Sequence, residues 1–247
     1  IINSEPKLSK MEKKETASEA ILVQKHENAQ TRLRDSDLRW LALAFTCFTM
    51  VGDFYCMNLF TALQSAIKEN FDLGDDNTKF NFLSSVGSVP GIILPFLGGM
   101  MINRFGVRPV YISAAAAAII GYSIITLGIA YLDFNLLIMG KLVAAFGMGP
   151  LFVSKSAMLV KWFAGKELSL ALGAALVISR VASSLDSIIS PRVYEWTHVL
   201  AYPFVIGVGV TILAFMAILG VCYIDNKADI EENSLALQNE ETAPLIG

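Results

Sequence analysis

The chain has 247 residues, of which 54% are hydrophobic and 17% are charged, with a net charge of −3. Charged residues usually make up about 25% of a soluble domain, and here they gather in the first 39 residues, in short turns and after Tyr223. This segregation and the mean hydropathy of +0.55 exclude an ordinary soluble protein and indicate a polytopic membrane protein.

Residues 1–37 form a polar segment that is rich in lysine and carries no apolar signal sequence. Such a composition cannot bury enough apolar surface to order itself, so we expect a disordered or loosely helical tail. The chain begins with Ile1 instead of methionine, which is consistent with a fragment of a longer protein.

Six apolar stretches between residues 38 and 225 are each long enough to cross a bilayer, which takes ~20 helical residues. They must be helices, because lipid offers the backbone no hydrogen-bond partner. The predicted fold is therefore an all-α bundle of six transmembrane helices, followed by an acidic segment at 226–247 that is a tail or the start of a central linker. The predicted spans are Trp40–Ile67, Asn81–Ile102, Pro109–Tyr131, Leu136–Val160, Leu168–Val193 and Val199–Ile224.

Lysine and arginine set the expected orientation of these spans. The N-terminal tail, the turn with Arg104 and Arg108 and the turn with Lys161 and Lys166 all fall on one side, which the positive-inside rule makes cytosolic. The opposite side receives the acid-rich stretch 68–79. Both termini are therefore predicted to be cytosolic.

Two charged residues lie deep in predicted spans, where insertion costs at least ~2.5–3.5 kcal/mol and points to a cavity or a partner. Arg180 lies about 12 residues into the fifth span, ~18 Å at ~1.5 Å per residue, and Asp53 lies ~20 Å into the first. Arg180 suits a substrate carboxylate, because its planar fork allows bidentate pairing. Asp53 either binds a substrate amine or a proton, or is the fixed partner of Arg180.

Other polar residues in the spans are weaker candidates for a substrate path. Asp186 lies one and a half turns beyond Arg180, and Tyr55 and Asn58 are polar enough to line a path. Lys155 is expected to extend its ammonium group to the cytosolic interface. Lys141, near the luminal end of the fourth span, either does the same or faces a cavity.

Motifs of soluble enzymes are missing from the sequence, which has no His-Glu-x-x-His, no Gly-x-Ser-x-Gly and no phosphate loop. Cys47, Cys56 and Cys222 fall inside apolar runs without metal-ligand spacing and are predicted to be buried free thiols. We therefore expect no enzyme activity, no cofactor, no metal site and no nucleic-acid partner.

The turn sequence GGMMINRFGVRP resembles the loop between helices two and three of the major facilitator superfamily. Gly99, Arg104, Gly106 and Arg108 match that family's pattern, and Asn103 stands where the family has an aspartate. In the family this loop is a charged latch between helix ends on the cytosolic side. The resemblance implies the same role for these five residues, with a latch weakened by the lost carboxylate.

The fourth span strengthens this resemblance. GKLVAAFGMGP is similar to the family's glycine-rich motif in helix four, with Lys141 at the basic position, which favours its facing a cavity. The resemblance covers about residues 38–225. It implies half of a fold that has two parallel six-helix halves, each built from 3+3 inverted repeats.

A narrower resemblance joins YCMNLFTALQ, WFAGKEL and SRVASS to the lysosomal dipeptide uniporter group of that superfamily. In that group an arginine of helix five binds the peptide carboxylate, which implies this role for Arg180. The group's amine-binding glutamate in helix four is replaced here by Gly149, and an aspartate of the group is replaced by Asn58.

The resemblance implies a secondary transporter for a small organic solute such as a dipeptide, with the lipid bilayer, a second six-helix half and an accessory membrane subunit as candidate partners. The alternative is a non-transporting six-helix sensor that works by docking to another protein. Near the C-terminus, Glu241, Leu245 and Ile246 fit an acidic dileucine sorting signal, which favours a lysosomal or endosomal membrane.

Overall fold

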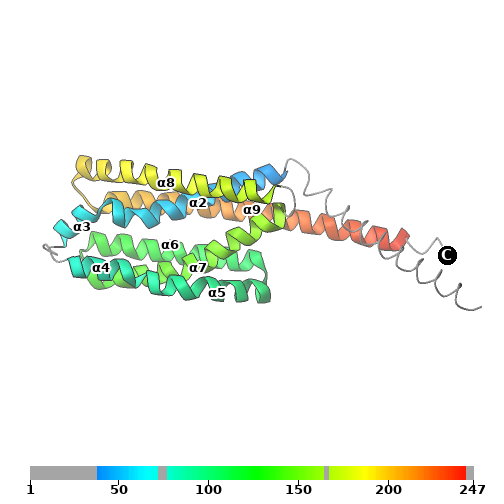
Figure 1. The fold of residues 1–247 in the computed structure, drawn as a ribbon, viewed down its shortest axis with the longest axis horizontal. Helices are drawn as coiled ribbons and strands as arrows, with labels where there is room; N and C mark the ends of the chain where they lie inside the picture. Colours follow the sequence, from blue (N-terminus) through cyan, green and yellow to red (C-terminus); the bar gives the residue numbers. More distant parts are fainter. Residues whose placement is uncertain (1–37, 72–76, 164–166, 243–247) are drawn as a thin grey trace, which may run out of the picture. The chain divides into compact units, whose positions relative to one another are not determined.

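The computed structural model describes residues 38–71, 77–163 and 167–242, and every regular element within them is an α-helix (Figure 1). The N-terminal tail and the dileucine pair lie outside these residues. The helices are α2 (Leu38–Ala62), α3 (Gln64–Asn70), α4 (Asn77–Val86), α5 (Ser88–Phe105), α6 (Val107–Ala130), α7 (Phe134–Phe163), α8 (Leu168–Thr197) and α9 (Ala201–Thr242).

Six helical segments within the described residues are long and apolar enough to cross a membrane, which confirms the predicted count. The first predicted span is divided, because α2 ends at Ala62 and the short helix α3 follows after Leu63. The second span is α4 and α5 together, Thr78–Phe105, with a break at Gly87. The remaining four spans are α6, α7, α8 and the first part of α9.

Helix α9 continues well beyond the predicted end of the sixth span at Ile224. It runs to Thr242, through a segment that contains neither glycine nor proline and that includes four glutamates, two alanines and two leucines. These residues have high helix propensity, so the helix persists where the hydropathy falls. By its internal contacts the chain divides into two units, Trp40–Cys222 and the remainder, and only the first concerns the site.

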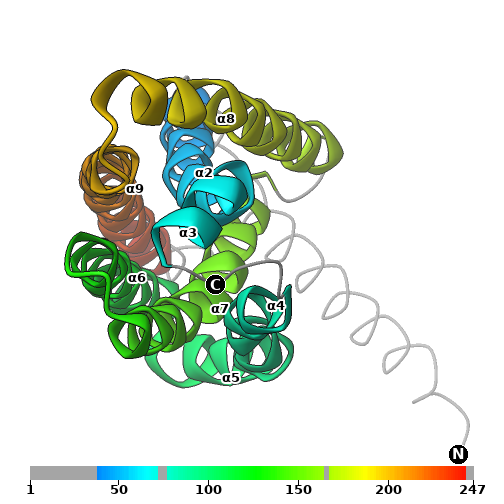
Figure 2. The ribbon, with the colours of Figure 1, turned by 90° about the vertical axis from the view of Figure 1, so that its left-hand side faces the viewer.

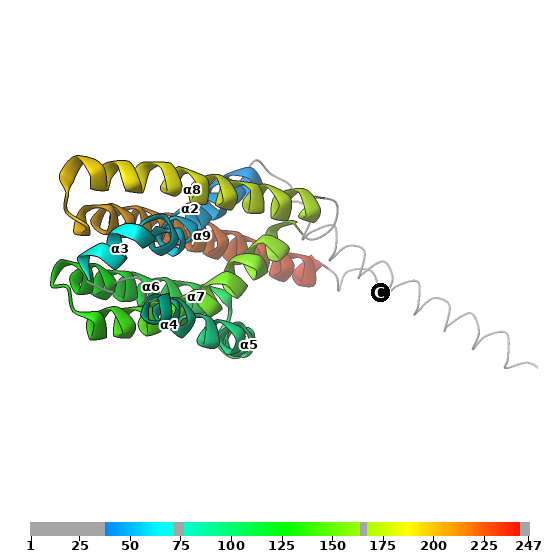
Figure 3. The same cartoon turned by 60° about the vertical axis from the view of Figure 1, so that its left-hand side comes forward.

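Within Trp40–Cys222 the helices form two groups of three. Helices α2, α8 and α9 lie together in one group, and α5, α6 and α7 lie together in the other (Figures 2 and 3). The first group therefore combines helices from both ends of the spanning region, whereas the second consists of three consecutive helices. This arrangement places α2 and α7 where the two groups meet.

Helices α6 and α7 approach so closely that their backbones touch at glycine positions. A Cβ atom added at Gly121 would lie 2.3 Å from the backbone nitrogen of Ala144, and one added at Gly147 would lie 2.5 Å from that of Ala118. No side chain larger than hydrogen fits at either position without displacing the partner helix. The small residues of the third and fourth spans thus serve the close helix packing that is common in lipid.

Candidate functional site

Asp53 and Lys155 form a buried ion pair between α2 and α7. The carboxylate of Asp53 accepts from the ammonium group of Lys155, which also donates to the backbone oxygen of Thr49 at 3.3 Å. Both charged residues are buried within the bundle. The expectation that Lys155 reaches the interface is therefore wrong, because a carboxylate on the neighbouring helix holds it inside.

The same pair takes the place of one of the two alternatives for Asp53, a fixed pairing with Arg180. Equal depth in the membrane brings two residues to one level, but the pair forms only where both side chains point into the same helix contact. Asp53 points toward α7, and Thr49 of the same helix hydrogen-bonds through its hydroxyl to Tyr111 of α6 at 2.9 Å. These two contacts join α2 to the α5–α7 group.

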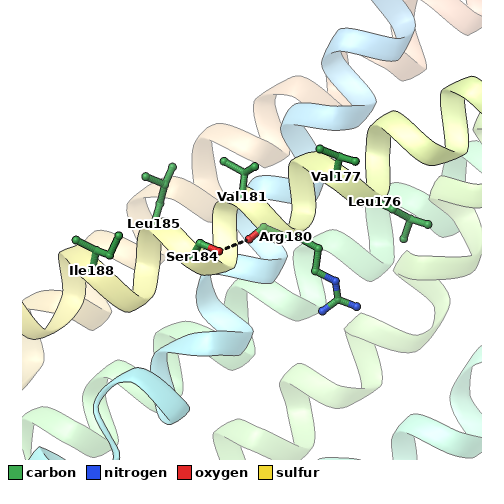
Figure 4. A pocket seen from close by; sticks show the side chains of 7 residues that line it. All are labelled: Leu176, Val177, Arg180, Val181, Ser184, Leu185 and Ile188. Carbon is green, nitrogen blue, oxygen red and sulfur yellow. Dashed lines mark hydrogen bonds between the residues drawn. The ribbon is translucent and has the colours of Figure 1, made fainter.

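Arg180 lies on the exposed side of α8 and lines a cavity of about 440 Å³ along that helix (Figure 4). Val177, Val181 and Leu185 of the same helix line this cavity with it. Within the described part of the chain, the guanidinium group of Arg180 has no hydrogen-bond acceptor. The backbone oxygen of Arg180 accepts from the hydroxyl of Ser184 at 3.0 Å. The guanidinium group is therefore accessible to an anion.

Asp186 lies fully buried at the centre of a polar cluster between α2 and α8. Its carboxylate accepts from the hydroxyl of Ser190 and, at 3.1 Å, from the side-chain amide of Asn58. That amide also donates to the backbone oxygen of Ser183 at 3.0 Å, and the Tyr55 hydroxyl lies 3.3 Å from that of Ser190. The structure thus brings together three of the predicted site residues, Tyr55, Asn58 and Asp186, in a cluster that contains neither Arg180 nor Asp53.

Lys141 lines a second cavity, of about 620 Å³, whose wall comes from α2, α4, α5, α6 and α7. Its ammonium nitrogen lies 3.9 Å from the ring centre of Phe60, within the range of a cation–π interaction. Met57 and Ile92 in the same wall are 64% and 81% exposed, so the cavity opens to the outside of the described helices. Of the two alternatives for Lys141, the structure shows the cavity.

Several hydroxyl groups in this cavity wall were not among the predicted site residues. They belong to Thr61, Ser84, Ser88 and Tyr122. Single serines and threonines in apolar helices usually bond to their own backbone, so the sequence carries no signal that separates these from the others.

Gly149 also lies in the wall, at the position where the resemblance places an amine-binding glutamate. A Cβ atom there would lie 2.5 Å from the Cβ atom of Leu94 and 3.1 Å from the backbone nitrogen of Pro95. As the helices pack here, no side chain fits at position 149. The loss of the glutamate is thus coupled to a close contact between α5 and α7.

The predicted latch forms the short turn between α5 and α6. Gly106 has a φ of +87°, a conformation that L side chains rarely adopt, and its N–H donates to the backbone oxygen of Ile102 at 2.8 Å. The Arg104 guanidinium lies 5.6 Å from the ring centre of Phe105, and Asn103 is exposed. A Cβ atom at Gly99 would meet no neighbour within 4 Å.

The three cysteines are free and buried, as the sequence predicts. Within the described residues, no group of three or more His, Cys, Asp or Glu side chains could hold a metal ion. The polar chemistry of this region consists of two cavity-lining cations, one buried ion pair and one buried carboxylate cluster.

Comparison with known proteins gives one family and one group of relatives. The profile of the Major Facilitator Superfamily matches residues 34–245. The lysosomal dipeptide transporter MFSD1 of Mus musculus and that of Homo sapiens are each 30% identical to the chain over 201 residues. The protein of the same name from Danio rerio is 29% identical over 201 residues. Each match covers 77% of this chain and 43% of the relative, so the chain spans less than half the length of these relatives.

Proposed function

Because this chain belongs to the Major Facilitator Superfamily, we propose that it forms one six-helix half of a secondary transporter for a small organic solute. The solute binds between this half and a second one, and the two halves open in alternation toward either side of the membrane. The observation that carries the proposal is the cavity of about 620 Å³ lined by Lys141. A cation beside a cavity within an apolar bundle is typical of a substrate path.

The proposed binding residues fall into two kinds. Arg180 and Lys141 are the cations that would receive an anionic group of the solute. Tyr55, Asn58 and Asp186 form the polar cluster between α2 and α8 that would receive its hydrogen-bonding groups. Asp53 would take part when an arriving anion competes with it for Lys155.

The turn between α5 and α6 is proposed as the cytosolic latch that changes partners when the halves move. Gly99 and Gly106 shape the helix ends, and Arg104 and Arg108 supply the charges. Asn103 replaces the carboxylate that would strengthen the closed state.

The substrate and the membrane are proposed from the relatives. These relatives are named as lysosomal dipeptide transporters, so dipeptides are the first solutes to test and the lysosomal membrane is the proposed location. The acidic dileucine pattern of Glu241, Leu245 and Ile246 supports that location. An accessory membrane subunit and the second half are the proposed protein partners.

The experiment that tests this proposal is solute uptake by the full-length protein in proteoliposomes. Dipeptides, amino acids and monocarboxylates are each offered, and saturable uptake of at least one class above protein-free vesicles is expected. Arg180→Ala and Arg180→Lys should both reduce uptake, because each loses the planar fork. Lys79→Gln, which removes an exposed charge on α4, is the matched control. If no class of solute is taken up, the transport proposal fails and the alternative of a non-transporting sensor that docks to another protein is favoured.

A further inference from the structure

The cavity around Lys141 is unusual in its balance of charge. Its described lining residues include one cation, Lys141, and no aspartate or glutamate. The buried carboxylates of Asp53 and Asp186 are engaged elsewhere: Asp53 with Lys155, and Asp186 with Ser190 and Asn58. A ligand in this cavity therefore meets a positive charge without a negative one.

The ammonium group of Lys141 is positioned by an aromatic ring instead of an acid. It lies 3.9 Å from the centre of the Phe60 ring, and no salt bridge to it is found among the described residues. A cation–π contact uses the face of a ring and leaves ammonium hydrogens free to donate elsewhere. The group is thus oriented and still able to bind an anion.

The cavity is roomy, and apart from the four hydroxyl groups described above the rest of its wall is apolar. A volume of about 620 Å³ falls within the range of about 300–1,000 Å³ that is typical of small-molecule sites. Thioether and aromatic side chains, which adapt to irregular apolar ligands, contribute much of the surface. The thioether and aromatic side chains are those of Met57, Met148, Phe60 and Phe152, and Ile92 and Ile125 add aliphatic surface.

Gly149 of α7 lines the cavity at a position where the helix packing leaves no room for an acidic side chain. Its backbone lies against Leu94 so closely that a Cβ atom would be 2.5 Å from the Cβ atom of that residue. A free amine in the cavity would then face Lys141, neutral hydroxyl groups or the apolar wall, and none of the described lining residues offers it a carboxylate. Repulsion by Lys141 and desolvation against the apolar wall disfavour an ammonium ion, and neutral hydroxyl groups do not balance its charge.

We propose that the Lys141 cavity selects solutes that have one carboxylate and an apolar body, and that it discriminates against the same body carrying an amine. This inference rests on the proposed transport function and specifies the substrate class of that site. The ligand's carboxylate pairs with Lys141, and its body lies against the methionine and aromatic wall.

Three probes with the same phenyl body test this selection in the full-length protein. They are 3-phenylpropionate, which has only the carboxylate; phenylalanine, which has both groups; and phenethylamine, which has only the amine. Binding is measured by titration calorimetry of the purified protein, and uptake is measured in proteoliposomes. We expect 3-phenylpropionate to bind most tightly, phenylalanine roughly tenfold more weakly, and phenethylamine not at all.

Variants then assign the selection to the cavity. Lys141→Met should weaken 3-phenylpropionate binding by roughly ten- to a hundredfold, the effect of losing one charged hydrogen bond, while Lys141→Arg should retain most of it. Lys79→Met serves as the control. Equal or tighter binding of phenylalanine or phenethylamine overturns the inference, as does a preference that survives Lys141→Met.

The two proposals fail in distinguishable ways. Uptake of dipeptides or phenylalanine without binding of 3-phenylpropionate overturns the substrate class and leaves transport standing. Binding of 3-phenylpropionate without uptake of any solute overturns transport and leaves the cavity's selection standing.

Discussion

Two of the lysines of helix α7, Lys141 and Lys155, have opposite environments. Lys155 is fully enclosed and paired with Asp53, whereas Lys141 lies beside an aromatic ring at the wall of an open cavity. Fourteen residues separate them, which is close to four helical turns, so they project from nearly the same face. A lysine inside a membrane bundle is therefore paired with a carboxylate or left facing a cavity according to what the neighbouring helix offers, and its own helix does not decide.

The largest expected effect on stability comes from removing the carboxylate that pairs with Lys155. Asp53→Asn leaves the Lys155 ammonium buried without its carboxylate, which typically costs about 3–5 kcal/mol. We expect a large fall in the thermal unfolding midpoint of the purified protein, measured by the fluorescence of its tryptophans. The double change Asp53→Asn with Lys155→Met should recover most of the loss, and a single variant as stable as the wild type would contradict the pair.

A smaller loss is expected from restoring a carboxylate in the cavity of the unpaired lysine. Gly149→Glu inserts a side chain where a Cβ atom would lie 2.5 Å from Leu94, and overpacking of this kind costs about 1–3 kcal/mol. Adding Leu94→Ala should relieve much of this cost. The affinity for phenylalanine is then compared between the double variant and the wild type, which shows whether an acid at position 149 allows a ligand with an amine to bind. Unchanged stability of Gly149→Glu would disprove the close contact.

Removing the unpaired lysine should cost less still. Lys141→Met strands no carboxylate and gives up one cation–π contact, worth roughly 0.5–2 kcal/mol. The unfolding midpoint should therefore change far less than for Asp53→Asn in the same assay. A loss as large as that of Asp53→Asn would remove the distinction between the two lysines.

The smallest effect concerns the turn between α5 and α6, where the charges are exposed. Asn103→Asp restores a carboxylate near basic groups, and a surface pair contributes only ~0–1 kcal/mol. The full-length protein should shift by a few-fold at most toward the state closed on the cytosolic side. Spin-label distances across that side test this, and a shift toward opening would count against the latch.

The sequence was sufficient for the features that depend on one helix at a time. Hydropathy gave the six spans, which the structure confirms among the described residues. It was insufficient where two helices share a contact. Counting residues along each span predicted that Asp53 and Arg180 lie at the same depth in the membrane. A contact also requires that each helix is rotated so that the two side chains face each other. That rotation turns Asp53 toward Lys155, and no single-helix pattern records it.

The polar residues show the same difference between what one helix reveals and what depends on a contact between two helices. Asn58, Tyr55 and Asp186 were predicted as separate candidates, and their meeting around one carboxylate depends on the contact between α2 and α8. The extension of α9 to Thr242 was missed for another reason: hydropathy reports where a membrane span ends, and helix propensity decides where the helix ends.

The backbone contact between α6 and α7 has a consequence for biogenesis. These helices are consecutive and joined by the short turn at residues 131–133, so their contact closes a small loop. The Asp53–Lys155 contact joins residues 102 positions apart. Contacts between near neighbours form before distant ones, so the α6–α7 hairpin should assemble as soon as it leaves the ribosome and insert as a preformed unit against which α2 later docks.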